Sequence, residues 1–342
     1  MIEELKSKRW ILISGKGGTG KTVLACTIAL QMAKIGEKTL VVSVDPAHSL
    51  SDALKMEIGP EIKEVEGVTQ LHALEFTPAE MYRMDETMLE TALGKYKQEF
   101  EGMEGLFSLS PEEMLGTLTD VVSLPLEYTE GLAFIKLFDS LQESEFDKII
   151  FDTAPTGHTL KLLELPDALD SMLGKIIRFR LKISSFWNKF KGLFGVKAEN
   201  PQEKMLDALE RLKDTIIRLQ NVLRNEETTE FITVTLPMVM SILESLRLVG
   251  TLDGYEIPHH FLVVNKLRVY EGDCTFCKNL SKIHEKNLHQ IQREFDDLKI
   301  RCVPYFSEEV RGVDKLERFY EFLEGTTPEN VESWLKEGED IE

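Results

Sequence analysis

A glycine-rich segment near the N-terminus has the residue types and spacing of a loop that binds phosphate. It reads GKGGTGKT and lies between an apolar run at residues 10–14 and a helical pattern from Lys21 to Lys34. Glycines let several backbone N–H groups converge on an anion, and the start of the following helix adds positive partial charge. We expect Lys21 to reach the β- and γ-phosphates of a nucleoside triphosphate and the Thr22 hydroxyl to bind Mg²⁺. The predicted phosphate-binding residues are Gly15, Lys16, Gly17, Gly18, Thr19, Gly20, Lys21 and Thr22.

Two aspartates follow apolar runs elsewhere in the chain. Asp45 begins the segment DPAHSLSD, and Asp152 begins DTAPTGHTLKLL. Ligands of open α/β sheets bind beyond the carboxyl ends of the strands, so we expect both carboxylates beside the phosphates. We predict that Asp45 orients or activates the attacking water and that Asp152 holds Mg²⁺ with Thr22. The alternative for Asp45 is that it only begins a turn before Pro46. Gly157 is expected to offer its backbone N–H to the γ-phosphate.

Short, unbroken apolar runs separated by helical patterns must position these groups. Unbroken runs are typical of strands that are buried on both faces of a parallel sheet. The order strand, glycine loop, helix, strand indicates an α/β fold of the P-loop NTPase type, with a mostly parallel sheet flanked by helices. The expected strands lie at residues 10–14, 39–44, 148–151, 231–235, 260–264 and 300–303.

Two long stretches interrupt this alternation. Residues 77–135 and 161–225 show helical patterns and are rich in methionine, leucine and phenylalanine. We interpret them as one α-helical subdomain that is inserted into the α/β core. The core then comprises residues 1–76, 136–160 and 226–342.

The insertion contains apolar stripes at helical spacing. Met81, Met84 and Met88 fall at i, i+3 and i+7, and Leu173 and Ile177 belong to a second stripe. Composition alone favours stripes that pack against one another. The alternative is an apolar groove, because flexible methionine side chains suit surfaces that accept many sequences.

Composition and charge exclude several classes of protein. The chain has 342 residues, with 40 Lys and Arg against 59 Asp and Glu, and a formal net charge of −19. Such a chain repels phosphate backbones, so we expect no nucleic-acid partner. We find no apolar run of about 18 residues, no signal peptide and too few cysteines for a disulfide scaffold, so we expect a cytoplasmic protein. Residues 171–198 are basic and aromatic, which is typical of either a membrane or receptor contact or an ordinary solvated helix face.

The three segments GKGGTGKT, DPAHSLSD and DTAPTGHTLKLL together resemble the arsenite-pump ATPase family and its eukaryotic and archaeal relatives, the ATPases that target tail-anchored membrane proteins. The likeness extends from Trp10 to about Leu323. The extra lysine of the loop, Lys16, is similar to that of the deviant P-loop class. This implies a homodimer with Lys16, Lys21 and Asp45 as catalytic residues. Of these, Lys16 is expected to act on the nucleotide of the partner subunit. The resemblance also assigns the adenine to Asn265, Pro304 and Tyr305.

Cys274 and Cys277 form a CxxC pair that offers two thiolates, whereas tetrahedral zinc takes four ligands. A two-fold dimer would supply four thiolates, so we favour a zinc ion shared across the dimer. A free or redox-active pair is the alternative. The pair also resembles a motif of the tail-anchored targeting branch.

The resemblance implies a homodimeric, ATP-hydrolysing chaperone that binds the transmembrane helices of tail-anchored proteins and delivers these proteins to the membrane. A membrane receptor would bind the chaperone there. It assigns Met81, Met84, Met88, Leu173 and Ile177 to the client groove, and ATP, Mg²⁺ and Zn²⁺ to the cofactors. The alternative is an arsenite- or antimonite-stimulated ATPase of a metalloid efflux pump. A metalloid site needs soft thiolates near the helical region. Residues 77–135 and 161–225 contain no cysteine and the chain has one P-loop, which counts against the pump. A thiol-dependent holdase that does not use ATP is a third hypothesis.

Overall fold

The structure, a computed structural model, describes residues 1–43, 49–76, 137–152, 214–268 and 273–331. The chain divides into two compact units. The first unit comprises Met1–Pro78, Glu143–Thr159 and Asn221–Glu342, and the second comprises Ala79–Gln142 and Leu160–Gln220. Of the second unit the structure describes only residues 137–142 and 214–220, which are helical. The predicted division of the chain therefore stays a prediction. It places the helical subdomain at residues 77–135 and 161–225 and the α/β core at residues 1–76, 136–160 and 226–342.

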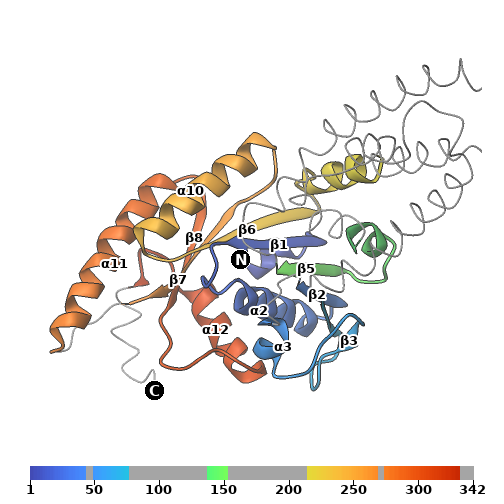
Figure 1. The fold of residues 1–342 in the computed structure, drawn as a ribbon, viewed down its shortest axis with the longest axis horizontal. Helices are drawn as coiled ribbons and strands as arrows, with labels where there is room; N and C mark the ends of the chain where they lie inside the picture. The colour runs from blue at the N-terminus through green and yellow to red at the C-terminus, as the bar shows by residue number, and fades with distance from the viewer. Residues whose placement is uncertain (44–48, 77–136, 153–213, 269–272, 332–342) are drawn as a thin grey trace, which may run out of the picture. The chain divides into compact units, whose positions relative to one another are not determined.

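An eight-stranded sheet forms the first unit, in the order β3-β4-β2-β5-β1-β6-β7-β8 (Figure 1). Every neighbouring pair is parallel except β3 and β4, which are antiparallel. The mostly parallel α/β fold that the sequence predicts is confirmed, and each of the six predicted strands is present. The two strands that the sequence analysis did not predict are β3 and β4. The strands are β1 (Trp10–Gly15), β2 (Thr39–Ser43), β3 (Lys63–Glu64), β4 (Leu71–Glu75), β5 (Lys148–Asp152), β6 (Thr229–Thr235), β7 (Phe261–Leu267) and β8 (Lys299–Pro304).

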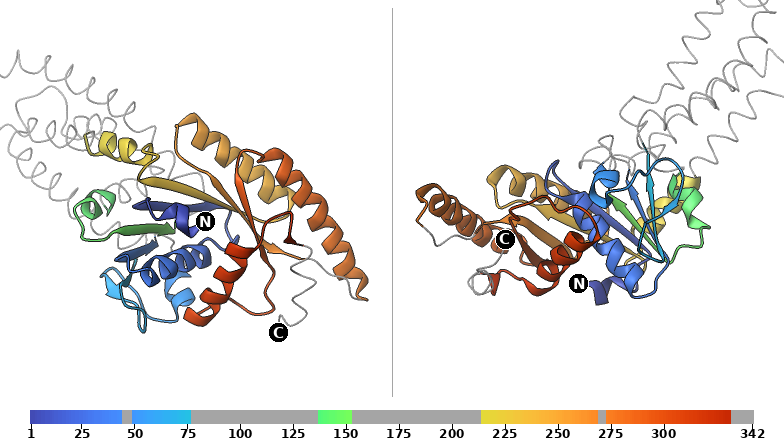
Figure 2. Two further views of the ribbon diagram at one scale, coloured as in Figure 1. Left: turned by 180° about the vertical axis from the view of Figure 1, so that it is seen from behind. Right: turned by 90° about the horizontal axis from the view of Figure 1, so that it is seen from below.

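Helices cover both faces of the sheet (Figure 2). The alternation of side chains along β7 shows the two layers, because Phe261 and Val263 belong to one buried cluster whereas Leu262 and Val264 belong to another. The first cluster contains side chains of α1, α2, α3 and α12, and the second contains side chains of α10 and α11. The helices are α1 (Ile2–Leu5), α2 (Lys21–Lys34), α3 (Ser49–Leu54), α10 (Val239–Gly254), α11 (Thr275–Glu294) and α12 (Val313–Gly325).

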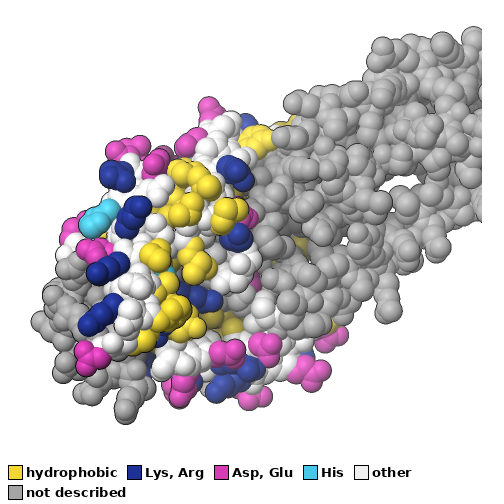
Figure 3. Space-filling model, turned by 60° about the vertical axis from the view of Figure 1, so that its left-hand side comes forward, with side chains coloured by type: hydrophobic (Ala, Val, Ile, Leu, Met, Phe, Trp, Pro, Cys, Tyr) yellow, Lys and Arg dark blue, Asp and Glu magenta, His cyan; other side chains and the backbone are white. Residues whose placement is uncertain are grey.

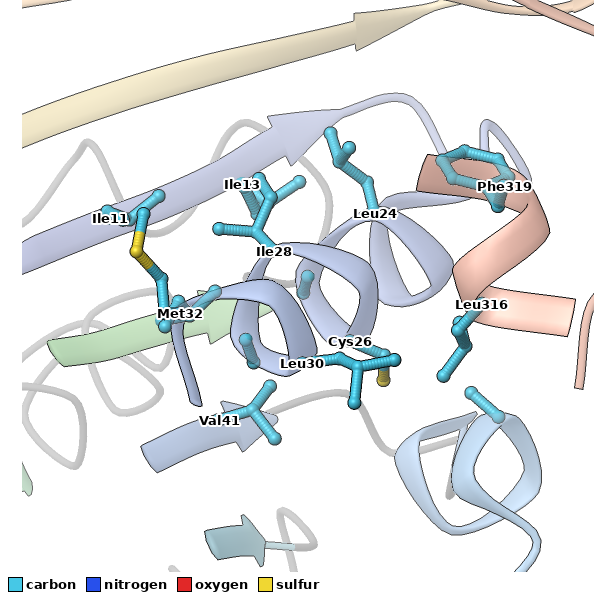
Figure 4. Close-up of a cluster of buried hydrophobic side chains, with 14 of the residues drawn as sticks. Ile11, Ile13, Leu24, Cys26, Ile28, Leu30, Met32, Val41, Leu316 and Phe319 are labelled. Atoms are coloured by element: carbon cyan, nitrogen blue, oxygen red, sulfur yellow. The ribbon is translucent and has the colours of Figure 1, made fainter. Parts of the chain in front are cut away.

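The helix that follows the glycine loop, α2, is buried on most of its surface. Ile28 and Met32 lie towards the side chains of β1, while Leu316 and Phe319 of α12 lie near the other end of α2 (Figure 4). Burial of each large apolar side chain contributes about 1.5–3 kcal/mol. The position of α2 is therefore fixed by packing, and with it the position of the loop at its N-terminus.

Two of the four cysteines belong to this core. Cys26 of α2 and Cys302 of β8 are both buried. Burial raises the pKa of the Cys26 thiol far above its ordinary value and raises the pKa of Cys302 to about 12. Both thiols are therefore neutral packing groups at physiological pH. Within the described residues, no helix combines the length and the apolar character that crossing a membrane requires.

Candidate functional site

The loop between β1 and α2 adopts backbone conformations that favour glycine. Gly15, Gly18 and Gly20 have φ values of +152°, +77° and +96°. A Cβ atom on Gly15 would lie 2.2 Å from the carbonyl oxygen of Val234, and one on Gly20 would lie 2.3 Å from Nδ2 of Asn265. The loop therefore lies directly against β6 and β7, and glycine is required at these two contacts.

Hydrogen bonds within the loop hold its two lysines at different places. The Thr19 hydroxyl donates to the carbonyl oxygen of Lys16 over 2.8 Å, and the ammonium of Lys21 donates to the same oxygen over 3.4 Å. Lys21 is buried, so its charge lies against the loop. The ammonium of Lys16 instead lies 3.5 Å from the carboxylate of Glu244 on α10, and both side chains are partly exposed. The two lysines of the motif are thus directed to different surroundings.

Residues at the end of β7 brace the loop from outside. The Asn265 carboxamide donates to the carbonyl oxygen of Thr19 over 2.7 Å and accepts from the backbone N–H of Lys266 over 2.8 Å. The Lys266 ammonium donates to the carbonyl oxygen of Gly18 over 3.0 Å. The carbonyl groups of Gly18 and Thr19 are thus held by β7, while the Thr19 N–H donates within the loop to the carbonyl oxygen of Lys16 over 3.3 Å. The sequence analysis assigned Asn265 only to adenine, and the bracing contact depends on tertiary packing that no local pattern reveals.

Thr22 and Asp152, the residues predicted to bind Mg²⁺, lie together. The Thr22 hydroxyl donates to the Asp152 carboxylate over 2.6 Å and lies 3.1 Å from the Ser49 hydroxyl, while Ser43 donates to Asp152 over 3.4 Å. Asp152 is paired in register with Ser43 of β2 and Ile13 of β1. Oxygen atoms from a hydroxyl and a buried carboxylate are the ligands that Mg²⁺ prefers. The pair fits that ion.

Glu75 is a buried acidic residue of this region that the sequence analysis missed. It ends β4, is 1% exposed, and accepts hydrogen bonds from the backbone N–H of Leu50 and the hydroxyl of Ser51 over 2.9 and 2.5 Å. A carboxylate at this position caps the N-terminus of α3. Its sequence signal is an acid that closes an apolar run, as Asp152 does.

The predicted adenine residues lie at the carboxyl ends of β7 and β8. Pro304 ends β8 and is buried, whereas the Tyr305 ring is 55% exposed. The backbone N–H of Tyr305 donates to the carbonyl oxygen of Leu267, and the Arg268 guanidinium lies 5.5 Å from the centre of its ring. An exposed flat ring at this edge of the sheet is suited to stacking on a base.

Cys274 and Cys277 lie at the start of α11, away from the core. Cys274 is the N-cap residue, and its sulfur accepts a hydrogen bond from the backbone N–H of Cys277 over 3.3 Å. This hydrogen bond holds the pKa of Cys274 below its ordinary value, whereas the contact with Cys274 raises the pKa of Cys277. Among the described residues, no cluster of three or more His, Cys, Asp or Glu side chains is placed to hold a metal ion. The two thiols of the CxxC pair are therefore the cysteine ligands that this end of α11 offers.

Several predicted site residues lie outside the described residues, and their roles stay predictions. These residues are Asp45, Met81, Met84, Met88, Gly157, Leu173 and Ile177. The basic stretch at residues 171–198 also lies outside.

Comparison with known proteins gives the same family along nearly the whole chain. Residues 8–325 match the family described as anion-transporting ATPase. The chain is 33% identical over 324 residues to ATPase ASNA1 homolog 1 of Paramecium tetraurelia, which covers 94% of both chains. It is 35% identical over 329 residues to ATPase GET3 of Podospora anserina, covering 94% of this chain and 92% of the relative. It is 39% identical over 323 residues to ATPase GET3C of Arabidopsis thaliana, covering 91% and 81%. The chain is therefore an ATPase, and it belongs to the anion-transporting ATPase family.

Proposed function

We propose that this ATPase is a targeting factor that binds the transmembrane helices of tail-anchored membrane proteins and delivers them to the membrane. The observation that carries the proposal is the likeness to relatives named GET3 and ASNA1, which extends over more than nine-tenths of the chain and so includes both compact units. An ATPase core alone would account for a match to the first unit only.

The geometry of the first unit supports the hydrolytic part of the proposal. The N–H groups of the loop at residues 15–22 and the Lys21 ammonium would bind the phosphates, and the Thr22 and Asp152 oxygens would hold Mg²⁺, which would supply charge neutralisation. Asp45 orients the attacking water, and the Gly157 N–H senses the γ-phosphate. Catalysis then depends on positioning and electrostatics, with no covalent intermediate.

We propose that the adenine base of ATP binds at the carboxyl ends of β7 and β8. Tyr305 offers an exposed ring and Pro304 an apolar contact, and the Asn265 carboxamide retains one N–H and one lone pair beyond its bonds to Thr19 and Lys266. An amide beside a flat apolar surface is what recognition of a purine requires.

We further propose a homodimer, with Lys16 directed to the partner's nucleotide. Three consecutive residues at the start of α10, Met238, Val239 and Met240, are at least half exposed, and Leu243 is also exposed. Hydrophobic side chains gather on the face shown in Figure 3. Exposed apolar patches of this kind mark interaction surfaces. Glu244, the partner of Lys16 in the single chain, directly follows this segment.

A zinc ion held by Cys274 and Cys277 of two chains would join the dimer at α11. Thiolates are suitable zinc ligands, and the low pKa of Cys274 favours deprotonation. A membrane receptor and tail-anchored clients are the remaining proposed partners, and a cytoplasmic location is consistent with such a role.

The proposal is tested by client capture. The purified chain is incubated with ATP and a tail-anchored protein in detergent-free buffer, and the soluble complex is isolated by gel filtration. We expect capture of a client whose apolar helix has about 20 residues and no capture of a client whose helix is replaced by a polar segment. Failure to hold the first client, or equal recovery of both, contradicts the proposal.

The anion-transporting description of the family favours one other candidate, a metalloid-stimulated ATPase. The two cysteines of the core are buried and the other two lie at the start of α11, so the described residues contain no cluster of three thiols. Stimulation of ATP turnover by antimonite would favour this candidate over the targeting factor.

A further inference from the structure

The short helix α3 lies between two parts of the proposed nucleotide site. Its N-terminal end is held by Glu75, and Ser49 lies 3.1 Å from the Thr22 hydroxyl, which in turn bonds Asp152. This end of α3 is therefore in contact with the magnesium ligands. A shift of α3 along its axis would move Ser49 relative to Thr22.

The C-terminal end of α3 is held by the loop that precedes α12. Nε of Arg311 donates to the carbonyl oxygen of Asp52 over 3.0 Å, and Nη2 donates to the Asp52 carboxylate over 2.8 Å. The backbone N–H of Gly312 donates to the carbonyl oxygen of Ala53 over 2.8 Å. A two-bond fork and a backbone hydrogen bond thus fix this loop to one turn of helix.

The approach at Gly312 is close. Gly312 has a φ value of +84°, and a Cβ atom there would lie 3.2 Å from the Lys55 side chain. Lys55, the residue that follows α3, has a φ value of +56°. A residue with a positive φ value therefore lies on each side of the contact, Lys55 after α3 and Gly312 in the loop.

The same loop begins at the proposed base site. Residues 305–312 connect the end of β8 to α12, with Tyr305 at the first position and Arg311 near the last. The backbone of the loop leads from Tyr305 to Arg311, and hydrogen bonds then lead through Asp52 and α3 to Ser49, Thr22 and Asp152. Figure 1 shows α3 beside α12.

We propose that Asp52 and Arg311 are positioning residues that couple occupation of the base site to binding of Mg²⁺ at Thr22 and Asp152. The proposal rests on the proposed function, because it takes the base to lie at Tyr305. An ion pair as exposed as this one contributes little to folding stability, so its expected effect is on coupling between the two subsites. By linkage, the base then strengthens Mg²⁺ binding by the same factor as Mg²⁺ strengthens binding of the base.

The test compares ADP with inorganic pyrophosphate, which lacks the base and, like ADP, has no γ-phosphate to lose. Affinities are measured by calorimetry on the full chain, with Mg²⁺ and with EDTA. In the unsubstituted protein we expect Mg²⁺ to tighten ADP binding about fivefold or more beyond its effect on pyrophosphate. In Arg311→Ala and Asp52→Asn we expect this excess to disappear, while each ligand still binds. Binding of Mg²⁺ to free ADP and free pyrophosphate is measured separately and subtracted, and it cancels when one ligand is compared between variants.

Two further variants sharpen the test. Arg311→Lys keeps the charge but lacks the planar fork, so it should behave as Arg311→Ala does. Lys315→Ala removes a neighbouring cation that pairs with Glu308 and donates to the carbonyl oxygen of Glu309, and because it leaves the Asp52–Arg311 pair in place it should retain the excess. The double variant Asp52→Asn/Arg311→Ala should be no worse than either single variant, because both remove one contact.

The outcomes separate the two proposals. If the unsubstituted protein binds pyrophosphate as tightly as ADP, the base site at Tyr305 is wrong. If it prefers ADP but Arg311→Ala retains the Mg²⁺ excess, or if Lys315→Ala loses it equally, the coupling is wrong and the base site stands. Thermal unfolding of each variant identifies any general loss of structure, and an excess that disappears only in variants that unfold would also overturn the coupling.

Discussion

At the scale of single residues, the site depends on glycine positions of the loop at which a neighbouring group leaves no room for a Cβ atom. Gly20 and Gly36 have nearly the same backbone conformation, with φ values of +96° and +97°, but Gly20 contacts Asn265 whereas nothing lies near the position of a Cβ on Gly36. Substituting each of these two glycines separates two free-energy costs. One is the cost of a left-handed backbone conformation, and the other is the cost of displacing the Asn265 carboxamide from the loop. Backbone conformation alone costs about 1–2 kcal/mol.

We predict that Gly20→Ala lowers the free energy of unfolding by clearly more than Gly36→Ala does, and that it alone weakens ATP binding. The added methyl group displaces the Asn265 carboxamide from the carbonyl oxygen of Thr19, which leaves buried polar groups unpaired at a cost of about 1–3 kcal/mol in addition. Urea denaturation and ATP titration measure the two effects. Equal destabilisation by both substitutions would show that the Asn265 contact has no energetic importance.

Asp152 gives a second prediction at this scale. Asp152→Asn keeps the shape of the side chain but removes the charge that suits Mg²⁺, so we expect ATP hydrolysis to fall by about 100-fold or more, with a much higher Mg²⁺ concentration for half-maximal activity. Asp253→Asn on the exposed end of α10 is the control and should leave both values unchanged. A fall in rate with no change in the Mg²⁺ requirement would remove Asp152 from the metal site.

At the scale of elements, the sequence predicted what short-range patterns determine. The mostly apolar runs of β1, β2, β5, β6, β7 and β8 were recognised because burial on both faces leaves few polar positions within them. β3 and β4 were missed, because β3 has two residues and β4 contains His72 within a run of only five. Asp152 was assigned from its position at a strand end. The same reasoning would have found Glu75 if β4 had been recognised.

The contacts of Asn265 and Arg311 were beyond the sequence for a different reason. Each bridges segments that are more than 240 positions apart, Asn265 to Thr19 and Arg311 to Asp52. Their partners follow from the order of strands in the sheet and from the packing of α12 beside α2. No local periodicity encodes either relation.

Glu75 provides the prediction at the scale of elements. In Glu75→Gln the side chain keeps its length, but the charged acceptor of the Leu50 N–H and Ser51 hydroxyl is replaced by a weaker neutral one. We expect a loss of about 1–3 kcal/mol in the free energy of unfolding and a higher Mg²⁺ requirement for hydrolysis, because α3 carries Ser49. Glu66→Gln, at an exposed position before β4, is the matched control. Unchanged Mg²⁺ dependence in Glu75→Gln would separate α3 from the metal site.

At the scale of the whole molecule, the proposed dimer brings together features that a single chain leaves incomplete. The CxxC pair offers two zinc ligands of four, the start of α10 exposes apolar side chains, and Lys16 is directed to Glu244 and away from Lys21. Replacing Cys274 and Cys277 with serine should reduce the zinc content from one ion per two chains to none and weaken the dimer. Metal analysis and sedimentation measure both, and unaltered zinc content would place the ion elsewhere.

The proposed role of Lys16 makes a prediction that only a dimer can satisfy. Lys16→Ala and Lys21→Ala chains should each be inactive alone, since each homodimer lacks one required lysine at both sites. If Lys16 acts on the partner's nucleotide, a mixed dimer contains one complete site, with Lys21 from the first variant and Lys16 from the second. Random mixing makes about half of the dimers mixed, so we expect ATP turnover of about a quarter of that of the unsubstituted protein. If Lys16 serves its own nucleotide, neither site of the mixed dimer is complete, and the mixture stays inactive although mass spectrometry detects both chains in one dimer.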